Sequence, residues 1–401
     1  MKRRFALCVL AICLMLAGCG TVSEQGGLGQ TEFASSEPMP GFDAQNKYAI
    51  SRAMSFQESD SFFCGSSTLG DNLYYYDKET GISGILCADP SCSHDSSSCG
   101  AYIKRGATMF LYDGLRYWIT DDYNTDGRDH VLWQGTLAGT DQKRVKTISF
   151  ENIILPYQPQ QYAIHRDALY FLGTADTVSG VTTGVRLTLM RSPLDDSEEF
   201  TTLFDQTYGA YVKADVRFAG DHAFLVVQTW TEAIANPPVD LAVYQIDLSS
   251  GKMETVYEKL GGACYDGFWV TEQEELYLLT RSAICKVEDG ALVPAAARKH
   301  TEDAAYLMDG IAVSIYLEDD QRCIEIVDFS GNTIYDGKIF PAEISGMDGD
   351  PNAYKKYSML IVGGDSDKLI IELSNFEAEE SYVILLDLHN NLEPTLLWKA
   401  Q

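Results

Sequence analysis

An all-β fold is predicted by three features of this sequence. From about Lys47 onward, short runs rich in Tyr, Val, Ile and Phe alternate with clusters of Gly, Asp, Asn and Ser, as is typical of strands separated by turns. A hairpin pattern recurs along the chain, in which an apolar run, a tight polar turn and a pair such as Leu-Tyr follow one another. The copies lie roughly 40–60 residues apart, a spacing typical of propeller blades.

The hairpin pattern has six recognisable copies, at 110–117, 164–170, 218–224, 270–277, 307–313 and 362–369. Each copy is followed by a second hairpin with a turn such as Asp247-Leu-Ser-Ser-Gly251, so that one unit provides four short antiparallel strands. An additional N-terminal unit at 62–87 has a similar turn, Asp77-Lys-Glu-Thr-Gly81. Such a unit has two apolar faces that it cannot bury alone, and units therefore stack around an axis until a ring closes. The sequence thus predicts a β-propeller of about seven four-stranded blades.

The predicted blades are 59–87, 107–150, 160–206, 214–259, 264–296, 304–341 and 357–399. The first blade has only three clear strands, and we expect the segment 47–56 or the C-terminal segment to supply the fourth. Because the fifth unit is short, six or eight blades stay open. A β-sandwich or two smaller β domains are the alternative folds.

The N-terminal segment has the pattern of an export signal. Lys2, Arg3 and Arg4 precede an apolar run that is too short to span a bilayer permanently, and Leu16-Ala-Gly-Cys19 follows. This ending resembles the lipobox of bacterial lipoproteins, in which the Cys is acylated with diacylglycerol and becomes the mature N-terminus. We therefore predict a signal peptide at 1–18 and lipidation of Cys19. The alternatives are an ordinary secretory signal with a chance Cys and an apolar stretch that has no targeting role.

Residues 19–46 are rich in Gly, Ser, Glu, Gln and Pro, which predicts a flexible linker after the lipidated Cys, and 47–401 form the predicted propeller domain. The expected location is the extracytoplasmic face of the cell membrane. Loss of the three signal cations would change the formal net charge from −28 to −31. A chain with this negative charge repels nucleic acid and the headgroups of anionic lipids. We therefore expect the lipid attached to Cys19, and not a basic patch, to anchor the protein to the membrane.

Cys87, Cys92, His94 and Cys99 lie close together between the first two predicted blades. Three interpretations stay open. The four residues could form a structural Cys3His zinc site, or export could lead to disulfides such as Cys92 with Cys99 and Cys64 with Cys87. The thiols could also be free, as we expect for Cys264, Cys285 and Cys323, which occupy isolated strand positions. Either cross-link would fix the connection between the two blades.

The stretch Leu86-Cys87, Pro90-x-Cys92-x-His94 and a later Cys99 resembles a motif of uncharacterised β-propeller-like lipoproteins of Gram-positive anaerobic bacteria. The resemblance includes the lipobox and the repeats, and so covers most of the chain. It implies a lipid-anchored propeller at the cell surface and no particular ligand or activity.

Asp122, Asn124 and Asp126, followed by Gly127, have the spacing that opens a calcium loop. The twelfth position holds Trp133 instead of Glu, and no helical pattern flanks the segment, so a polar hairpin is predicted rather than a calcium site. The histidines other than His94 lie in turn segments, and we expect them on the solvated surface.

The sequence contains no nucleophile elbow, zinc-protease helix motif or P-loop, and it assigns no catalytic residue. We predict a binding or protein-interaction scaffold whose ligand is a glycan, a peptide or an envelope protein. The alternative is a carbohydrate-active or other hydrolytic enzyme with its site at the mouth of the propeller channel.

Overall fold

The computed structural model describes most of the chain beyond residue 55. The predicted signal, Cys19, the linker and Cys264 lie outside the described residues. In the part that is described, no helix is long and apolar enough to cross a bilayer. The described residues are 56–103, 108–122, 129–137, 139–149, 161–179, 182–195, 200–209, 211–231, 239–262, 265–300, 304–319, 321–339 and 357–400.

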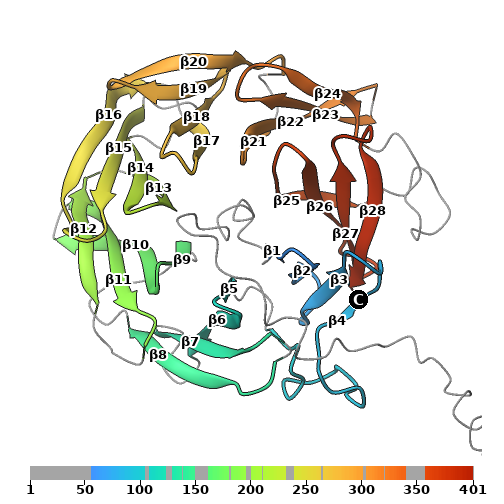
Figure 1. Cartoon of the computed structure of the whole chain (residues 1–401). Coiled ribbons are helices and arrows are strands. Elements are labelled where there is room, and N and C mark those ends of the chain that lie inside the picture. The colour runs from blue at the N-terminus through green and yellow to red at the C-terminus, as the bar shows by residue number, and fades with distance from the viewer. Residues whose placement is uncertain are drawn as a thin grey trace, which may run out of the picture.

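The described strands form seven sheets of four antiparallel strands, which are arranged as a ring (Figure 1). Blade 1 consists of β1 (Phe56–Glu58), β2 (Phe62–Gly65), β3 (Tyr74–Asp77) and β4 (Ser83–Ile85). Blade 2 consists of β5 (Thr108–Tyr112), β6 (Leu115–Asp122), β7 (Asp129–Thr136) and β8 (Lys143–Ser149). Blade 3 consists of β9 (Gln161–His165), β10 (Ala168–Ser179), β11 (Thr182–Pro193) and β12 (Thr201–Tyr208).

Blade 4 consists of β13 (Tyr211–Ala219), β14 (His222–Trp230), β15 (Val239–Asp247) and β16 (Met253–Gly262). Blade 5 consists of β17 (Tyr265–Val270), β18 (Leu276–Thr280), β19 (Ala283–Glu288) and β20 (Ala291–Ala297). Blade 6 consists of β21 (Ala305–Leu307), β22 (Ile311–Glu318), β23 (Gln321–Asp328) and β24 (Thr333–Lys338). Blade 7 consists of β25 (Ser358–Gly364), β26 (Lys368–Asn375), β27 (Glu380–Asp387) and β28 (Glu393–Ala400).

The predicted seven-bladed propeller is confirmed, and six blades, eight blades and a sandwich are wrong. Within each blade the first strand lies nearest the ring centre and the fourth lies at the periphery (Figure 1). The fourth strand that the sequence left unassigned in blade 1 is β1, at the end of the predicted segment 47–56. Every described blade is therefore made of consecutive strands, and the C-terminal strand β28 stays in blade 7.

Two of the tight turns that the sequence predicted are two-residue hairpin turns in which both central residues have positive φ. Asp113 and Gly114 have φ of 48° and 69°, and Arg166 and Asp167 have φ of 47° and 58°. Two left-handed residues in succession match the right-handed twist of the flanking strands. These turns explain why the first hairpins of blades 2 and 3 are so compact in the sequence.

The apolar core is divided among the interfaces between blades. Seven buried clusters occur among the described residues, and each contains side chains of two adjacent blades. A flat blade presents an apolar face to each neighbour, so burial is complete only when the ring is closed. The contact between blades 7 and 1 is thus as necessary as the other six.

Aromatic side chains close the ring between its first and last blades. Trp398 of β28 is 1% exposed and stacks on Phe56 of β1 at 5.6 Å between ring centroids. It also stacks on Tyr74 of β3 at 6.2 Å. Stacked aromatic pairs add to the free energy of burial. We call this contact between blades 7 and 1 the seam.

A buried polar network lies beside these aromatic rings. Glu372 of β26 is fully buried, and its carboxylate accepts hydrogen bonds from Ser67 Oγ at 2.8 Å and Thr68 N at 2.9 Å. Ser381 Oγ also contacts Ser67 Oγ, and Thr68 Oγ1 lies 2.8 Å from Ser374 Oγ. The network joins the β2–β3 connection of blade 1 to the adjacent ends of β26 and β27.

Replacement of Glu372 by Gln is expected to remove one contribution to stability that falls as the pH rises. Burial raises the pKa of Glu372 above the ordinary 4.5, although hydrogen bonds from Thr68 and Ser67 oppose the shift. The folded state therefore binds the proton more tightly than the unfolded state. This contribution to stability is full below pH 4.5 and is lost as the pH rises through the raised pKa.

Urea unfolding at about pH 4 and about pH 8 measures the effect. Relative to the unchanged chain, we expect Glu372→Gln to raise the midpoint at pH 8 with respect to the midpoint at pH 4. The exposed Glu377 in the neighbouring turn provides the control Glu377→Gln, which should leave the difference between the two midpoints as it is. Equal pH profiles for all three proteins would contradict the assignment.

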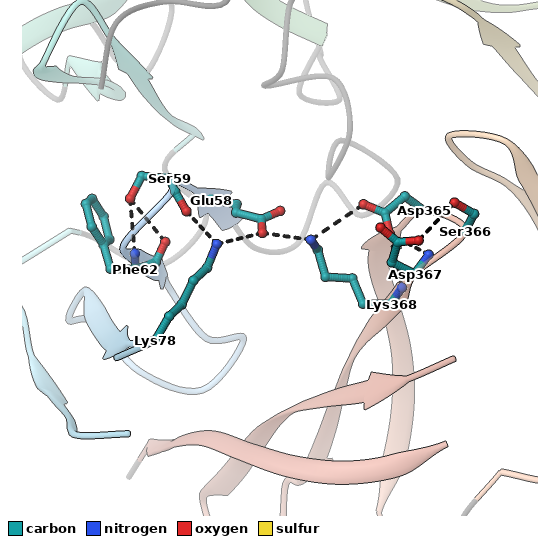
Figure 2. A network of polar contacts seen from close by, with 8 residues as sticks. All are labelled: Glu58, Ser59, Phe62, Lys78, Asp365, Ser366, Asp367 and Lys368. Carbon is teal, nitrogen blue, oxygen red and sulfur yellow. Dashed lines mark hydrogen bonds and ion pairs between the residues drawn. The ribbon is translucent and has the colours of Figure 1, made fainter. Parts of the chain in front are cut away.

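A second set of contacts crosses the seam at the opposite end of the strands (Figure 2). The Glu58 carboxylate of β1 lies 2.8 Å from the ammonium groups of both Lys78 and Lys368. Lys368 also faces Asp365 at 3.6 Å. These residues lie at the end of the ring where the first strand of a blade joins the second and the third joins the fourth, which we call the hairpin end. The opposite end, where the second strand joins the third, is called the connection end.

The prediction that the other histidines are solvated is wrong for His165. This side chain is 3% exposed, and its Nε2 lies 2.8 Å from the carbonyl oxygen of Gly220 in blade 4. Because a carbonyl only accepts, the ring donates from Nε2. Burial lowers the pKa of His165, which favours this neutral form. His389, in contrast, is exposed as predicted.

Candidate metal centre and the adjoining recess

The connection from β4 to β5 carries the Cys and His cluster at the connection end of the ring. At the start of the loop, Leu86 N donates a hydrogen bond to Leu73 O at 2.8 Å. Near its end, Ala101 O accepts a hydrogen bond from Leu73 N at 2.8 Å. Ile103 N then donates to Asp71 O at 2.8 Å. Both ends of the loop are thus paired with the β2–β3 connection of blade 1. The residues between them are held close to that blade.

Short turns set the positions of the side chains in this loop. Cys92 N donates to Asp89 O at 3.2 Å, a β-turn with Pro90 in the position that proline favours. Cys99 N donates to Ser96 O at 3.0 Å in a second turn. His94, between these turns, has a left-handed φ of 57°. The backbone therefore reverses twice within the loop.

The four predicted ligands converge. One ligand atom from each of Cys87, Cys92, His94 and Cys99 lies within 4.8 Å of the other three. His94 Nδ1 is 3.3 Å from Cys99 Sγ. The side chains of Cys87 and Cys99 are buried, and those of Cys92 and His94 are half-buried. This geometry brings together every residue of the predicted cluster.

Backbone amides point at two of the sulfurs. His94 N donates to Cys92 Sγ at 3.4 Å, and Ala101 N donates to Cys99 Sγ at 3.3 Å. Burial alone would raise the pKa of Cys87, but hydrogen bonds around its sulfur lower it. Burial raises the pKa of Cys99 to about 12. The cluster thus gathers thiols with opposite pKa shifts at one point.

Arg116 of β6 is a member of this site that the sequence analysis missed. It is 1% exposed, its Nη2 donates to Gly100 O at 2.9 Å, and its guanidinium lies 4.5 Å from the Trp118 ring. Its Nε and Nη1 are buried and have no hydrogen-bond partner. Burial lowers its pKa to about 10, while the thiols of Cys64, Cys99 and Cys87 favour its charged form.

Gly139, in the β7–β8 connection, packs directly on the loop. A Cβ at this position would lie 1.9 Å from Gly100 O, and the residue has a φ of +83°. No other residue type could allow so close an approach without displacing the loop. Blade 2 therefore supports the loop through Gly139 and Arg116.

No disulfide joins the described cysteines, and the pairings of Cys92 with Cys99 and of Cys64 with Cys87 stay predictions. Cys64, Cys87, Cys92 and Cys99 are all free, because the loop brings three thiols to one centre instead of joining two of them. Cys64 is fully buried and is not part of the cluster. Cys285 and Cys323 are buried and free in β19 and β23, which confirms the expectation for these strand positions.

The segment with the weak calcium pattern is described only at its edges. Asn124 and Asp126 lie outside the described residues, and so does Gly127. Asp122 ends β6 and pairs with Asp129 of β7. The two strands therefore flank this segment as the predicted hairpin requires.

A recess adjoins the cluster at the seam. Its volume is about 520 Å³, and three stretches of chain form it: the β2–β3 connection, the Cys and His loop and the β26–β27 turn. Asn72 Nδ2 donates to His94 O at 3.1 Å, whereas its Oδ1 is buried without a partner. The lining residues are Leu69, Asp71, Asn72, His94, Asp95, Tyr102, Phe376 and Glu379.

Comparison with known proteins supports the fold and no more. No protein-family model matches the chain, and no curated protein matches it in sequence. Among solved structures, dipeptidyl peptidase 4 of Porphyromonas gingivalis is similar with a TM-score of 0.51 and 10% identity, over 93% of this chain and 62% of that one. A structure from a study of two prolyl endopeptidases has a TM-score of 0.51 and 11% identity, over 85% and 48%.

An oligogalacturonate lyase in complex with manganese has a TM-score of 0.43 and 13% identity, over 89% of this chain and 88% of that one. This chain spans about half to three-fifths of the length of the two peptidase chains. At such identities the likeness extends to the propeller ring alone. The distant similarity agrees with the fold that the sequence predicted.

Proposed function

We propose that this protein is a lipid-anchored binding scaffold on the extracytoplasmic face of a bacterial cell membrane, related to the propeller-like lipoproteins that it resembles. The export signal that ends at Cys19 and the polar segment 19–46 support the anchor and the linker. The ring supplies a rigid body that carries a binding site above the membrane.

The recess at the seam is the observation that carries the proposal. About 520 Å³ is in the range of sites for small ligands or for a few side chains of a peptide. Three carboxylate residues line it, namely Asp71, Asp95 and Glu379. Phe376 is 63% exposed at its rim, which is unusual for a large apolar side chain.

This lining favours a cationic peptide or a basic segment of an envelope protein. Carboxylates attract an ammonium or guanidinium group, and the face of an aromatic ring binds the same groups through its quadrupole. The net charge of −28 adds a long-range attraction for such a ligand.

A binding screen on the purified chain tests the proposal. Lys-rich and Arg-rich peptides should bind, Glu-rich peptides of equal length should not, and added salt should weaken binding. Phe376→Ala should lower the affinity roughly 3- to 30-fold, as expected for a lost cation–π contact. Leu260→Ala, which removes an equally exposed apolar side chain from the outer strand β16, should have no effect.

The other outcomes would overturn the proposal. Binding of acidic and basic peptides alike would exclude recognition by charge. Preference for a glycan would favour the second ligand class that the sequence allows. Chemical turnover of any bound compound would favour the alternative of an enzyme at the channel mouth.

A further inference from the structure

We propose that Cys87, Cys92, His94 and Cys99 bind one structural Zn²⁺ ion, whose charge is balanced by the buried guanidinium of Arg116. The inference does not depend on the proposed ligand at the recess. It rests on the convergence of four ligand atoms and on an independent feature of a neighbouring blade.

The donor set fits zinc. Thiolate sulfur and imidazole nitrogen are the preferred ligands of Zn²⁺, and four of them complete its tetrahedral shell. At zinc–ligand distances of about 2.0–2.3 Å, the corners of a tetrahedron lie roughly 3.5–3.8 Å apart. The four ligand atoms here lie within 4.8 Å of one another, and Nδ1 of His94 is 3.3 Å from Cys99 Sγ.

Arg116 is the second observation, and it indicates a negative charge at the centre. Its guanidinium is almost fully buried, and two of its nitrogen atoms lack any hydrogen-bond partner. A buried cation without a counter-charge is strongly unfavourable. With three thiolates, one neutral imidazole and one Zn²⁺, the centre would have a net charge of −1, which Arg116 neutralises.

The loop also supplies the outer contacts that a metal centre requires. Backbone amides donate to Cys92 Sγ and Cys99 Sγ, and such bonds favour thiolate sulfur and orient it. Arg116 Nη2 donates to the carbonyl next to Cys99. These contacts come from the loop itself and from β6, so a bound ion would fasten the connection between blades 1 and 2.

The proposed role is structural, because four protein ligands leave no open position for water or substrate. The ion would hold His94 where its carbonyl accepts from Asn72 and its side chain lines the recess. A loop of this length has no strand of its own among the described residues. Metal binding would therefore add a cross-link that holds the middle of this loop in place.

Zinc content and thiol state of the full chain, purified from membranes in mild detergent, provide the first test. We expect about one zinc per chain, and cysteines that become reactive only after chelation and denaturation. Replacement of zinc by Co²⁺ should give the visible absorption of a tetrahedral thiolate site. Chains that contain no stoichiometric zinc, or in which these cysteines form disulfides, would overturn the proposal.

Variants locate the ion. Cys92→Ser and His94→Ala should each lower zinc content at equilibrium with a competing chelator at least tenfold, whereas His94→Cys should retain the metal through a fourth thiolate. Cys285→Ser and Cys323→Ser are matched controls, since both remove isolated buried thiols, and both should keep one zinc. Full zinc content in Cys92→Ser and His94→Ala would place the ion elsewhere. If a variant fails to fold, the cobalt spectrum of the unchanged chain still decides the question.

Discussion

Replacement of Trp398 by Ala is expected to lower the free energy of unfolding by about 3–5 kcal/mol. Trp398 is almost fully buried and stacks on both Phe56 and Tyr74, which belong to the opposite end of the chain. The change would leave a large cavity in the apolar cluster between blades 7 and 1. Because no described strand is shared between blades 7 and 1, side-chain contacts join them, and this cavity weakens closure of the ring.

Denaturant unfolding measures this effect. Trp230→Ala is the matched control, because Trp230 also stacks on an aromatic ring, that of Tyr211 at 5.8 Å, but is only half-buried and lies within a single blade. We expect a clearly smaller loss of stability for this control. Equal losses for the two variants would show that the seam has no special weight in the stability of the ring.

Replacement of Arg116 by Met should have opposite effects on the two metal states of the protein. With zinc bound, the change would leave a buried centre of net charge −1 without its counter-charge, and zinc affinity should fall about 10- to 100-fold. Without zinc, it removes a buried cation with two unpartnered nitrogen atoms, and stability should be unchanged or higher.

Competition with a chelator measures the affinity, and urea unfolding of the metal-stripped chain measures the stability. Arg217→Met is a close control: the Arg217 guanidinium lies 4.1 Å from the Trp269 ring, and its Nε donates to Phe268 O at 3.0 Å. No thiol cluster adjoins it among the described residues. This variant should leave zinc affinity unchanged. Loss of stability in metal-free Arg116→Met would contradict the charge argument.

The blade pattern could be predicted because its determinants are local. Each hairpin is specified by alternating side chains and by turns such as Asp113-Gly114, so seven similar units are visible in the sequence without knowledge of their packing. The exception was β1, which has only three residues and too little pattern to be recognised. Its position in blade 1 is set by pairing with β2.

The convergence of Cys87, Cys92, His94 and Cys99 was predictable for the same reason, since the four residues are close in sequence. Arg116 was not, because it comes from another blade and its sequence context is that of an ordinary strand. The recess combines the β2–β3 connection with the β26–β27 turn, which become neighbours only when the ring closes. The burial of His165 was not predicted for the same reason, because its hydrogen-bond partner Gly220 belongs to the next blade.

Blades 7 and 1 share no strand among the described residues, and this has a consequence for the order in which the apolar surfaces of the ring are buried. Blade 1 has all of its own strands as soon as it is synthesised, but its outward aromatic face meets Trp398 only when the last described strand is complete. At about 5–20 residues per second, this interval lasts roughly 20–70 s. During that time the apolar surface of blade 1 formed by Phe56, Phe63 and Tyr74 is not covered by blade 7. Burial of this surface is therefore among the last steps in the formation of the ring, because it requires the C-terminal strand β28.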